Sequence, residues 1–127
     1  YGDDLDLQRV DRRQRHMCIR YRYYQVNFEK RKTLHLAAVF SNNFSNHLYS
    51  IAHKITKTNN IDFDILKPLI QETANKILLL EPTKAQTGPA RRNDMDTIND
   101  HLKLLKNDDY KNLYKTFTQL IRDENKL

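Results

Sequence analysis

The stretch TLHLAAVFSNNFSNHLYSIAH, from Thr33 to His53, decides the fold of this chain. It holds 21 residues without a formally charged side chain between Lys32 and Lys54, although 30% of the whole chain is charged. A helix that avoids charge on all sides is typical of a protein interior or an interface. Its three asparagines and three histidines need hydrogen-bond partners when they are buried. We therefore predict a packed interface, a ligand site, or both along this helix.

Mostly apolar residues in and around this stretch recur at alternating steps of three and four. This heptad-like seam is typical of helix-on-helix packing. Its members are Leu34, Ala37, Ser41, Phe44, Leu48, Ile51 and Ile55. We expect a long central helix that begins near Phe28–Arg31, runs to about Lys57 and has protein neighbours all around it. The many Asn, His and Ser side chains argue against a membrane span.

Helix caps and prolines divide the rest of the chain into shorter helices and one long loop. Pro68 has no amide donor and is expected to kink or restart its helix. The expected elements are a helix capped by Asp62 that ends near Leu80, a loop over Glu81–Asp94, a helix over Met95–Lys106 capped by Asp94, and a helix over Tyr110–Asp123 after Asn107. The predicted fold class is therefore all-α, a long central helix with three or more shorter ones.

The N-terminal segment differs from this helical part. Residues 1–25 show no sustained period, so we expect an irregular basic arm or leader there and a helical domain over residues 26–127. Within the arm, RYRYYQV could form a short strand, because Tyr and Val favour pleated surfaces. Residues 1–32 hold nine Lys and Arg against five Asp and Glu. A basic excess can mark contact with nucleic acid or an anionic surface, and it is also ordinary solubility.

Composition excludes several chemistries. Cys18 is the single cysteine, so neither an internal disulfide nor a cysteine metal cluster can form, which fits the cytoplasm. His35, His47 and His53 lack the spacing of a zinc-binding HExxH helix, and no metal site is expected. The chain has two glycines and no glycine-rich turn. It therefore cannot hold a nicotinamide dinucleotide in the usual βαβ manner on its own.

Two groups of residues are candidates for a site. One helix stripe offers amides that could orient a substrate and imidazoles that could transfer a proton, or these groups are satisfied within a helical core. The stripe is His35, Asn42, Asn46, Tyr49 and His53. In the loop, Lys84, Arg91 and Arg92 surround Gln86–Pro89. These cations could bind an anionic ligand, or the loop is a structural turn whose arginines pair with Glu81 or Asp94.

Two segments carry a family resemblance. RKTLHLAAVFSNNFSNHLY, from Arg31 to Tyr49, and AQTGPARRND, from Ala85 to Asp94, resemble the two signatures of the domain of unknown function 2520, and the likeness extends roughly over Val26–Ile121. In that family the domain normally follows a Rossmann domain. The whole is similar to pyrroline-5-carboxylate reductase and the 6-phosphogluconate dehydrogenase group, whose helical half dimerises and closes the active site against the nicotinamide.

The resemblance implies the helical dimerisation and substrate-side domain of an NAD(P)-dependent oxidoreductase. It implies NAD(P) for the parent protein, with none bound tightly to this chain alone, which is expected to be inactive by itself. The implied partners are a second copy and the parent's Rossmann domain. The implied site residues are His35, Asn42 and Asn46 as catalytic groups, with Asn43, Gln86, Thr87, Gly88, Arg92 and Asp94 facing substrate or cofactor.

A second hypothesis comes from the basic arm. Arginines and tyrosines interleave between Arg9 and Arg22, as in proteins that combine phosphate contacts with base stacking. The alternative function is a stand-alone helical interaction module that binds nucleic acid or an acidic partner. Binding to nucleic acid would weaken steeply with salt. We expect neither nucleic acid nor a membrane as a partner under the leading hypothesis.

Overall fold

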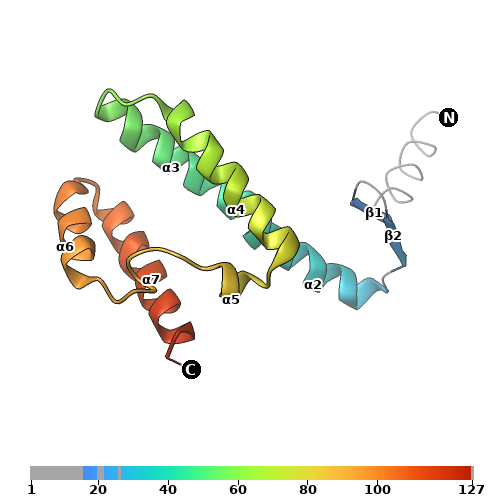
Figure 1. Cartoon of the computed structure of the whole chain (residues 1–127). Coiled ribbons are helices and arrows are strands. Elements are labelled where there is room, and N and C mark those ends of the chain that lie inside the picture. Colours follow the sequence, from blue (N-terminus) through green and yellow to red (C-terminus); the bar gives the residue numbers. More distant parts are fainter. Residues whose placement is uncertain (1–15, 20–21, 26, 127) are drawn as a thin grey trace. The chain divides into compact units, whose positions relative to one another are not determined.

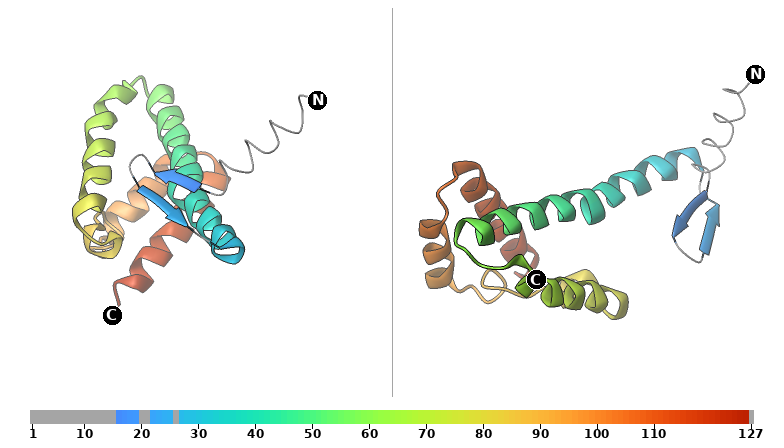
Figure 2. Two further views of the ribbon diagram at one scale, coloured as in Figure 1. Left: turned by 90° about the vertical axis from the view of Figure 1, so that its right-hand side faces the viewer. Right: turned by 90° about the horizontal axis from the view of Figure 1, so that it is seen from above.

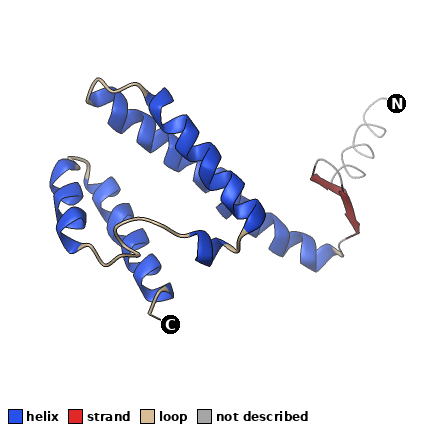
Figure 3. Ribbon diagram, viewed as in Figure 1, coloured by secondary structure: helices blue, strands red, loops and turns tan. Residues whose placement is uncertain are grey.

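The computed structural model describes residues 16–19, 22–25 and 27–126. These residues belong to two compact units, Tyr1–Phe63 and Asp64–Leu127. Helices make up most of the described residues of each unit (Figure 1 and Figure 3). The expected all-α class, with a long helix and several shorter ones, is therefore confirmed.

A small hairpin precedes the helices. Strand β1, His16–Ile19, pairs antiparallel with strand β2, Arg22–Gln25, with His16 opposite Gln25. The short strand that RYRYYQV favours is thus present and has a partner strand. The arm expected to be irregular over residues 1–25 is regular in these two strands. Its remaining residues, including most of the basic positions between Arg9 and Arg22, lie outside the described residues.

One long helix dominates the first unit. Helix α2, Phe28–Ala38, runs directly into the π-helical segment η1, Val39–Phe44, and then into α3, Ser45–Thr58. Figure 2 shows them as one continuous rod. The bounds agree with the expected helix, whereas the π-helical interior was not expected.

Asparagines delimit this helix at both ends. The side chain of Asn27 accepts a hydrogen bond from the Lys30 amide at 2.9 Å and caps the start of α2. At the other end Asn59 is the C-cap, and Asn60 takes a positive φ of 54°. Asparagine tolerates this left-handed conformation better than most residues with a side chain. The chain can therefore turn back sharply after α3.

The long helix is not covered by protein in the single chain. Helix α2 and η1, which the structure describes in full, bury none of their side chains, and α3 buries Ile51 and Thr56. Leu36 is 58% exposed and Phe40 63% exposed. The prediction that this helix is enclosed by neighbours on all sides is therefore wrong for one copy of the chain. A charge-free sequence indicates that a surface avoids water, but it does not say which molecule covers that surface.

The helical segment that follows α3 begins with a 3-10 turn before it becomes an α-helix. The 3-10 turn η2, Phe63–Leu66, leads into α4, Lys67–Leu79, which has Pro68 in its first turn. Proline is tolerated there because the first amides of a helix have no intrahelical partner. The expected restart at Pro68 is confirmed. The prediction that Asp62 caps the whole segment is wrong, because the α-helix begins only at Lys67.

The remaining elements of the second unit are α5, Pro82–Ala85, α6, Met95–Leu104, and α7, Asp108–Glu124. Asp94 caps α6 and Asn107 caps α7, each through its side chain, as the sequence indicates. Ile98 on α6 is 3% exposed, and Ala90 in the preceding loop is 7% exposed. Within the described part of the chain, no helix is both long and apolar enough to cross a membrane.

Candidate functional site

The loop between α5 and α6 is a folded turn built on unusual backbone angles. Gly88 has a φ of 104°, and Asn93 has a φ of 56°. The amide of Arg92 donates to the Gly88 carbonyl at 3.3 Å, and that of Asp94 donates to the Pro89 carbonyl at 2.9 Å. These bonds hold the loop against itself and bury Ala90. The loop can therefore present the side chains around it in fixed positions.

Gly88→Ala is expected to destabilise the protein by about 1–3 kcal/mol, because φ near 104° strains any residue with a Cβ atom. A Cβ atom at this position would meet nothing within 4 Å, so the loss would come from the backbone alone. Urea unfolding measures the effect. A matched Thr87→Ala variant should change the free energy of unfolding much less, and equal losses in both variants would contradict the backbone explanation.

The two adjacent arginines of the loop have different surroundings. Nη1 of Arg91 donates to the carbonyl oxygen of Lys84 at 3.2 Å and also to that of Gln86. Arg91 is therefore engaged in holding the loop together. Arg92 has a 63% exposed side chain, and its Nη2 lies 3.8 Å from Oδ2 of Asp94, beyond hydrogen-bond length. Its guanidinium remains available for a carboxylate or phosphate, which it can bind with two parallel bonds.

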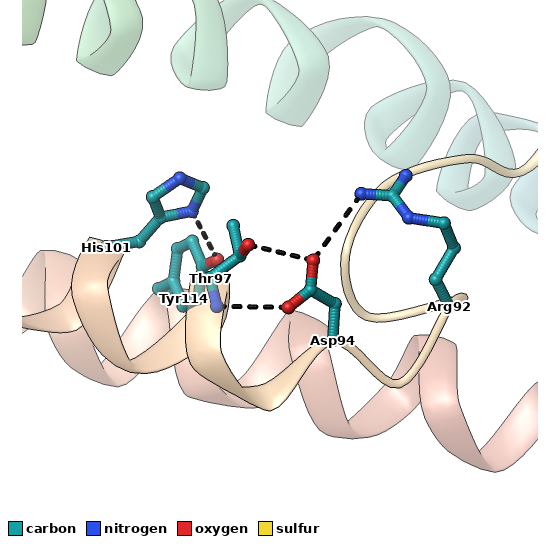
Figure 4. A network of polar contacts seen from close by, with 5 residues as sticks. All are labelled: Arg92, Asp94, Thr97, His101 and Tyr114. Carbon is teal, nitrogen blue, oxygen red and sulfur yellow. Dashed lines mark hydrogen bonds and ion pairs between the residues drawn. The ribbon is translucent and has the colours of Figure 1, made fainter.

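Asp94 is committed to the start of α6. Its Oδ1 accepts from the Thr97 amide at 3.1 Å, and its Oδ2 accepts from the Thr97 hydroxyl at 2.8 Å. These two hydrogen bonds lower the pKa of Asp94 below its ordinary 3.8, with smaller contributions from the positive charges of Arg92 and His101. The predicted N-cap role is confirmed. Figure 4 shows Thr97 next to the carboxylate, with Arg92 and His101 on either side.

The lowered pKa of Asp94 predicts a pH-dependent stability. The folded state binds this proton more weakly than the unfolded state, so the contribution is present above the ordinary value of 3.8 and is lost as pH falls below it. Asp94→Asn keeps an amide oxygen for the cap and cannot titrate. Thermal melts between about pH 6 and about pH 3 should show a larger fall in Tm for the native chain than for this variant.

A second carboxylate with a lowered pKa, Asp123, does not interfere with this test. The pKa of Asp123 is also lowered, mainly by its hydrogen bond with Gln119, and this residue is present in both the native chain and the Asp94→Asn variant. Its effect therefore cancels in the comparison. Parallel loss of Tm in the two proteins would show that Asp94 does not carry the effect.

A histidine and a tyrosine that no sequence motif indicates lie beside this cap. Nδ1 of His101 is 2.8 Å from the Tyr114 hydroxyl oxygen, and the two rings meet edge to face with centroids 5.8 Å apart. Partial burial raises the pKa of Tyr114 above its ordinary 10.0. Whichever group donates, the bond joins α6 to α7. Sequence spacing gives no signal for this pair, because its members lie on different helices.

The helix candidates belong to the first unit. His35 lies in the last turn of α2, Asn42 and Asn43 lie in η1, and Asn46 lies in the first turn of α3. All four are exposed in the single chain. The amides of the three asparagines make no hydrogen bond to any residue that the structure describes, so the alternative that they are satisfied within a helical core does not hold for the single chain. They are free to meet another molecule.

The loop candidates belong to the second unit and divide into structural and exposed groups. Gln86 donates through Nε2 to the Thr87 carbonyl at 2.9 Å, and Gly88 provides the turn. Thr87 and Arg92 are exposed. Across the described ranges, no group of three or more His, Cys, Asp or Glu side chains could hold a metal ion.

The fold and the loop together define a mainly helical protein whose loop between α5 and α6 turns at Gly88. Residues 13–121 match the family described as domain of unknown function DUF2520, and the chain belongs to this family. The resemblance carried by the two sequence motifs is confirmed.

A solved structure supports the same fold. A candidate NADP oxidoreductase of Bacteroides fragilis is 45% identical to the chain and superposes with a TM-score of 0.77 over 82% of it. The chain spans 41% of the length of that protein. No curated protein shows significant similarity to the chain.

Proposed function

We propose that this chain is the helical dimerisation and substrate-side domain of an NADP-dependent oxidoreductase. The 45% identity to a candidate NADP oxidoreductase supports this role. That protein is more than twice as long as the matched part, which leaves room for a separate cofactor-binding domain. In this proposal a Rossmann domain of the parent protein binds the cofactor in the cytoplasm, and the helical domain contributes to the substrate side.

The proposed dimer rests on one observation. The long helix exposes large apolar side chains in a single chain, and monomeric proteins rarely leave such a surface uncovered. Five of them are Leu36, Phe40, Phe44, Leu48 and Ile55. A second copy of the same helix would remove this surface from water, which is the main favourable term in association.

The described residues do not fit a dinucleotide by themselves. A pyrophosphate is usually held by a glycine-rich turn at a helix start. The loop offers Gly88 alone, and Arg91 beside it is engaged with backbone carbonyls. The cofactor phosphates are therefore assigned to the parent's other domain. For this chain the proposal retains Arg92 as an anion contact, with His35 and the asparagines 42, 43 and 46 toward the substrate.

Substitution in the parent oxidoreductase tests this assignment. Arg92→Ala should weaken ligand binding at least tenfold, because charge-assisted bidentate bonds to an anion are lost. Asn42→Ala should lower turnover in the same direction. Lys106→Ala, at an exposed position outside both motifs, is the matched control and should behave as the native enzyme. Native binding and turnover in the Arg92 and Asn42 variants would remove the substrate-side role.

A further inference from the structure

The π-helical segment lies in the middle of the exposed apolar side chains of the long helix. We call Leu36, Phe40, Phe44, Leu48 and Ile55 the apolar stripe. Four of the five members are spaced by four residues, and η1 covers the central step from Phe40 to Phe44. A π segment inside a longer helix is uncommon and often coincides with a functional position. Its placement within the stripe therefore needs an explanation.

Helix geometry shows what this segment does to the stripe. In an unbroken α-helix four residues turn about 40° beyond a full turn. Three such steps would place Leu48 about 120° around the axis from Leu36, on a different face. A π turn rotates each residue less, because its hydrogen bonds reach from residue i to i+5. The segment Val39–Phe44 therefore removes much of this drift and keeps the stripe on one side.

Contacts within η1 agree with this geometry. The rings of Phe40 and Phe44 meet edge to face, with centroids 5.0 Å apart, so both side chains lie on the same face. The hydroxyl of Ser45 donates to the Phe40 carbonyl at 3.4 Å, five residues back along the helix. Ile55 follows Leu48 by seven residues, nearly two α-helical turns, and so continues the same line.

The charge pattern of this surface suits the second copy of the chain that the proposed dimer requires. In a two-fold interface the same patch meets itself, so a patch without charge brings no unpaired charge into the contact from either copy. The 21 residues from Thr33 to His53 carry no formal charge, although 30% of the chain is charged. Such a patch is complementary to a second copy of itself. A strongly charged partner would find no opposite charge there.

We infer that η1 is a register device for self-association, which straightens the apolar stripe so that a second copy of this chain packs along its whole length. The inference rests on the dimer of the proposed function. It adds that the dimer depends on the extra residue that the π turn accommodates, as well as on the hydrophobicity of the helix.

Deletion of Ser41 tests the inference. Removing one residue should convert η1 into an α-helical turn, leave the helix content by circular dichroism unchanged, and raise the dimer Kd at least tenfold. Ser41→Ala is the length-preserving control. It loses only the 3.4 Å hydrogen bond of the Ser41 hydroxyl to the Ala38 carbonyl and should dimerise like the native chain. A deletion variant with native Kd by sedimentation equilibrium overturns the inference.

A second measurement decides the matter if the deletion variant does not fold. Leu36→Ala and Leu48→Ala lie at the two ends of the straightened segment and keep the chain length. On a straight stripe both should raise the dimer Kd by about tenfold. An effect of one and not the other indicates a drifting stripe and overturns the inference while leaving the dimer intact. A native chain that is monomeric overturns the inference and the proposed dimer together.

Discussion

Phe40→Glu is expected to turn the proposed dimer into a monomer, with a rise in Kd of about 100-fold or more. Phe40 is 63% exposed in the single chain and lies on the apolar stripe. In a two-fold interface the substitution is present twice, so two carboxylates enter an apolar contact without partners. Sedimentation velocity of the native chain and the variant over a range of concentrations measures the change.

Leu104→Glu is the matched control for this prediction. Leu104 is 76% exposed at the end of α6 and lies outside the apolar stripe. Its change to glutamate introduces the same charge at an exposed apolar position, and the dimer should persist. If Phe40→Glu leaves the mass of the particle unchanged, the long helix is not the contact between two copies.

Ile98→Ala is expected to lower the free energy of unfolding by about 2–5 kcal/mol. Ile98 is 3% exposed, the least exposed of the core residues, so its removal loses buried apolar surface and leaves a cavity. Small domains have total stabilities of about 5–15 kcal/mol, and this loss is a large part of that. Chemical denaturation followed by circular dichroism measures it.

Met95→Ala on the same helix provides the comparison. Met95 is 40% exposed, and its truncation should cost clearly less than that of Ile98. Equal losses would show that Ile98 is not part of a packed core. The comparison also separates packing from helix propensity, because both variants introduce alanine into α6.

Helix ends were predictable from single residues. Asp94 and Asn107 each accept a backbone hydrogen bond three residues ahead, and Pro68 lies in the first turn of α4. These are local effects, because a cap or a missing amide acts within one turn of its own residue. The same signals set the start of α6 and α7 in the sequence and in the structure. Asp62 failed as a start because a 3-10 turn intervenes before α4.

Features that depend on packing were not predictable. The residues VFSNNF contain no pattern that distinguishes a π turn from an α turn, since the same apolar spacing suits both. His101 and Tyr114 meet because α6 and α7 pack, and nothing in their spacing of thirteen residues indicates this. The different contacts of Arg91 and Arg92 also depend on the folded loop. Arg91 donates to a backbone carbonyl and Arg92 is exposed, although the two are neighbours of the same type.

The asparagines at positive φ, Asn60 and Asn93, have a consequence for the denatured chain. Many proteins place glycine at such left-handed turns, and glycine loses the most backbone freedom on folding. Asparagine samples fewer conformations when unfolded, so each reversal costs less entropy, although the native turn is somewhat strained. With two glycines in 127 residues, this polypeptide begins folding from a comparatively restricted ensemble.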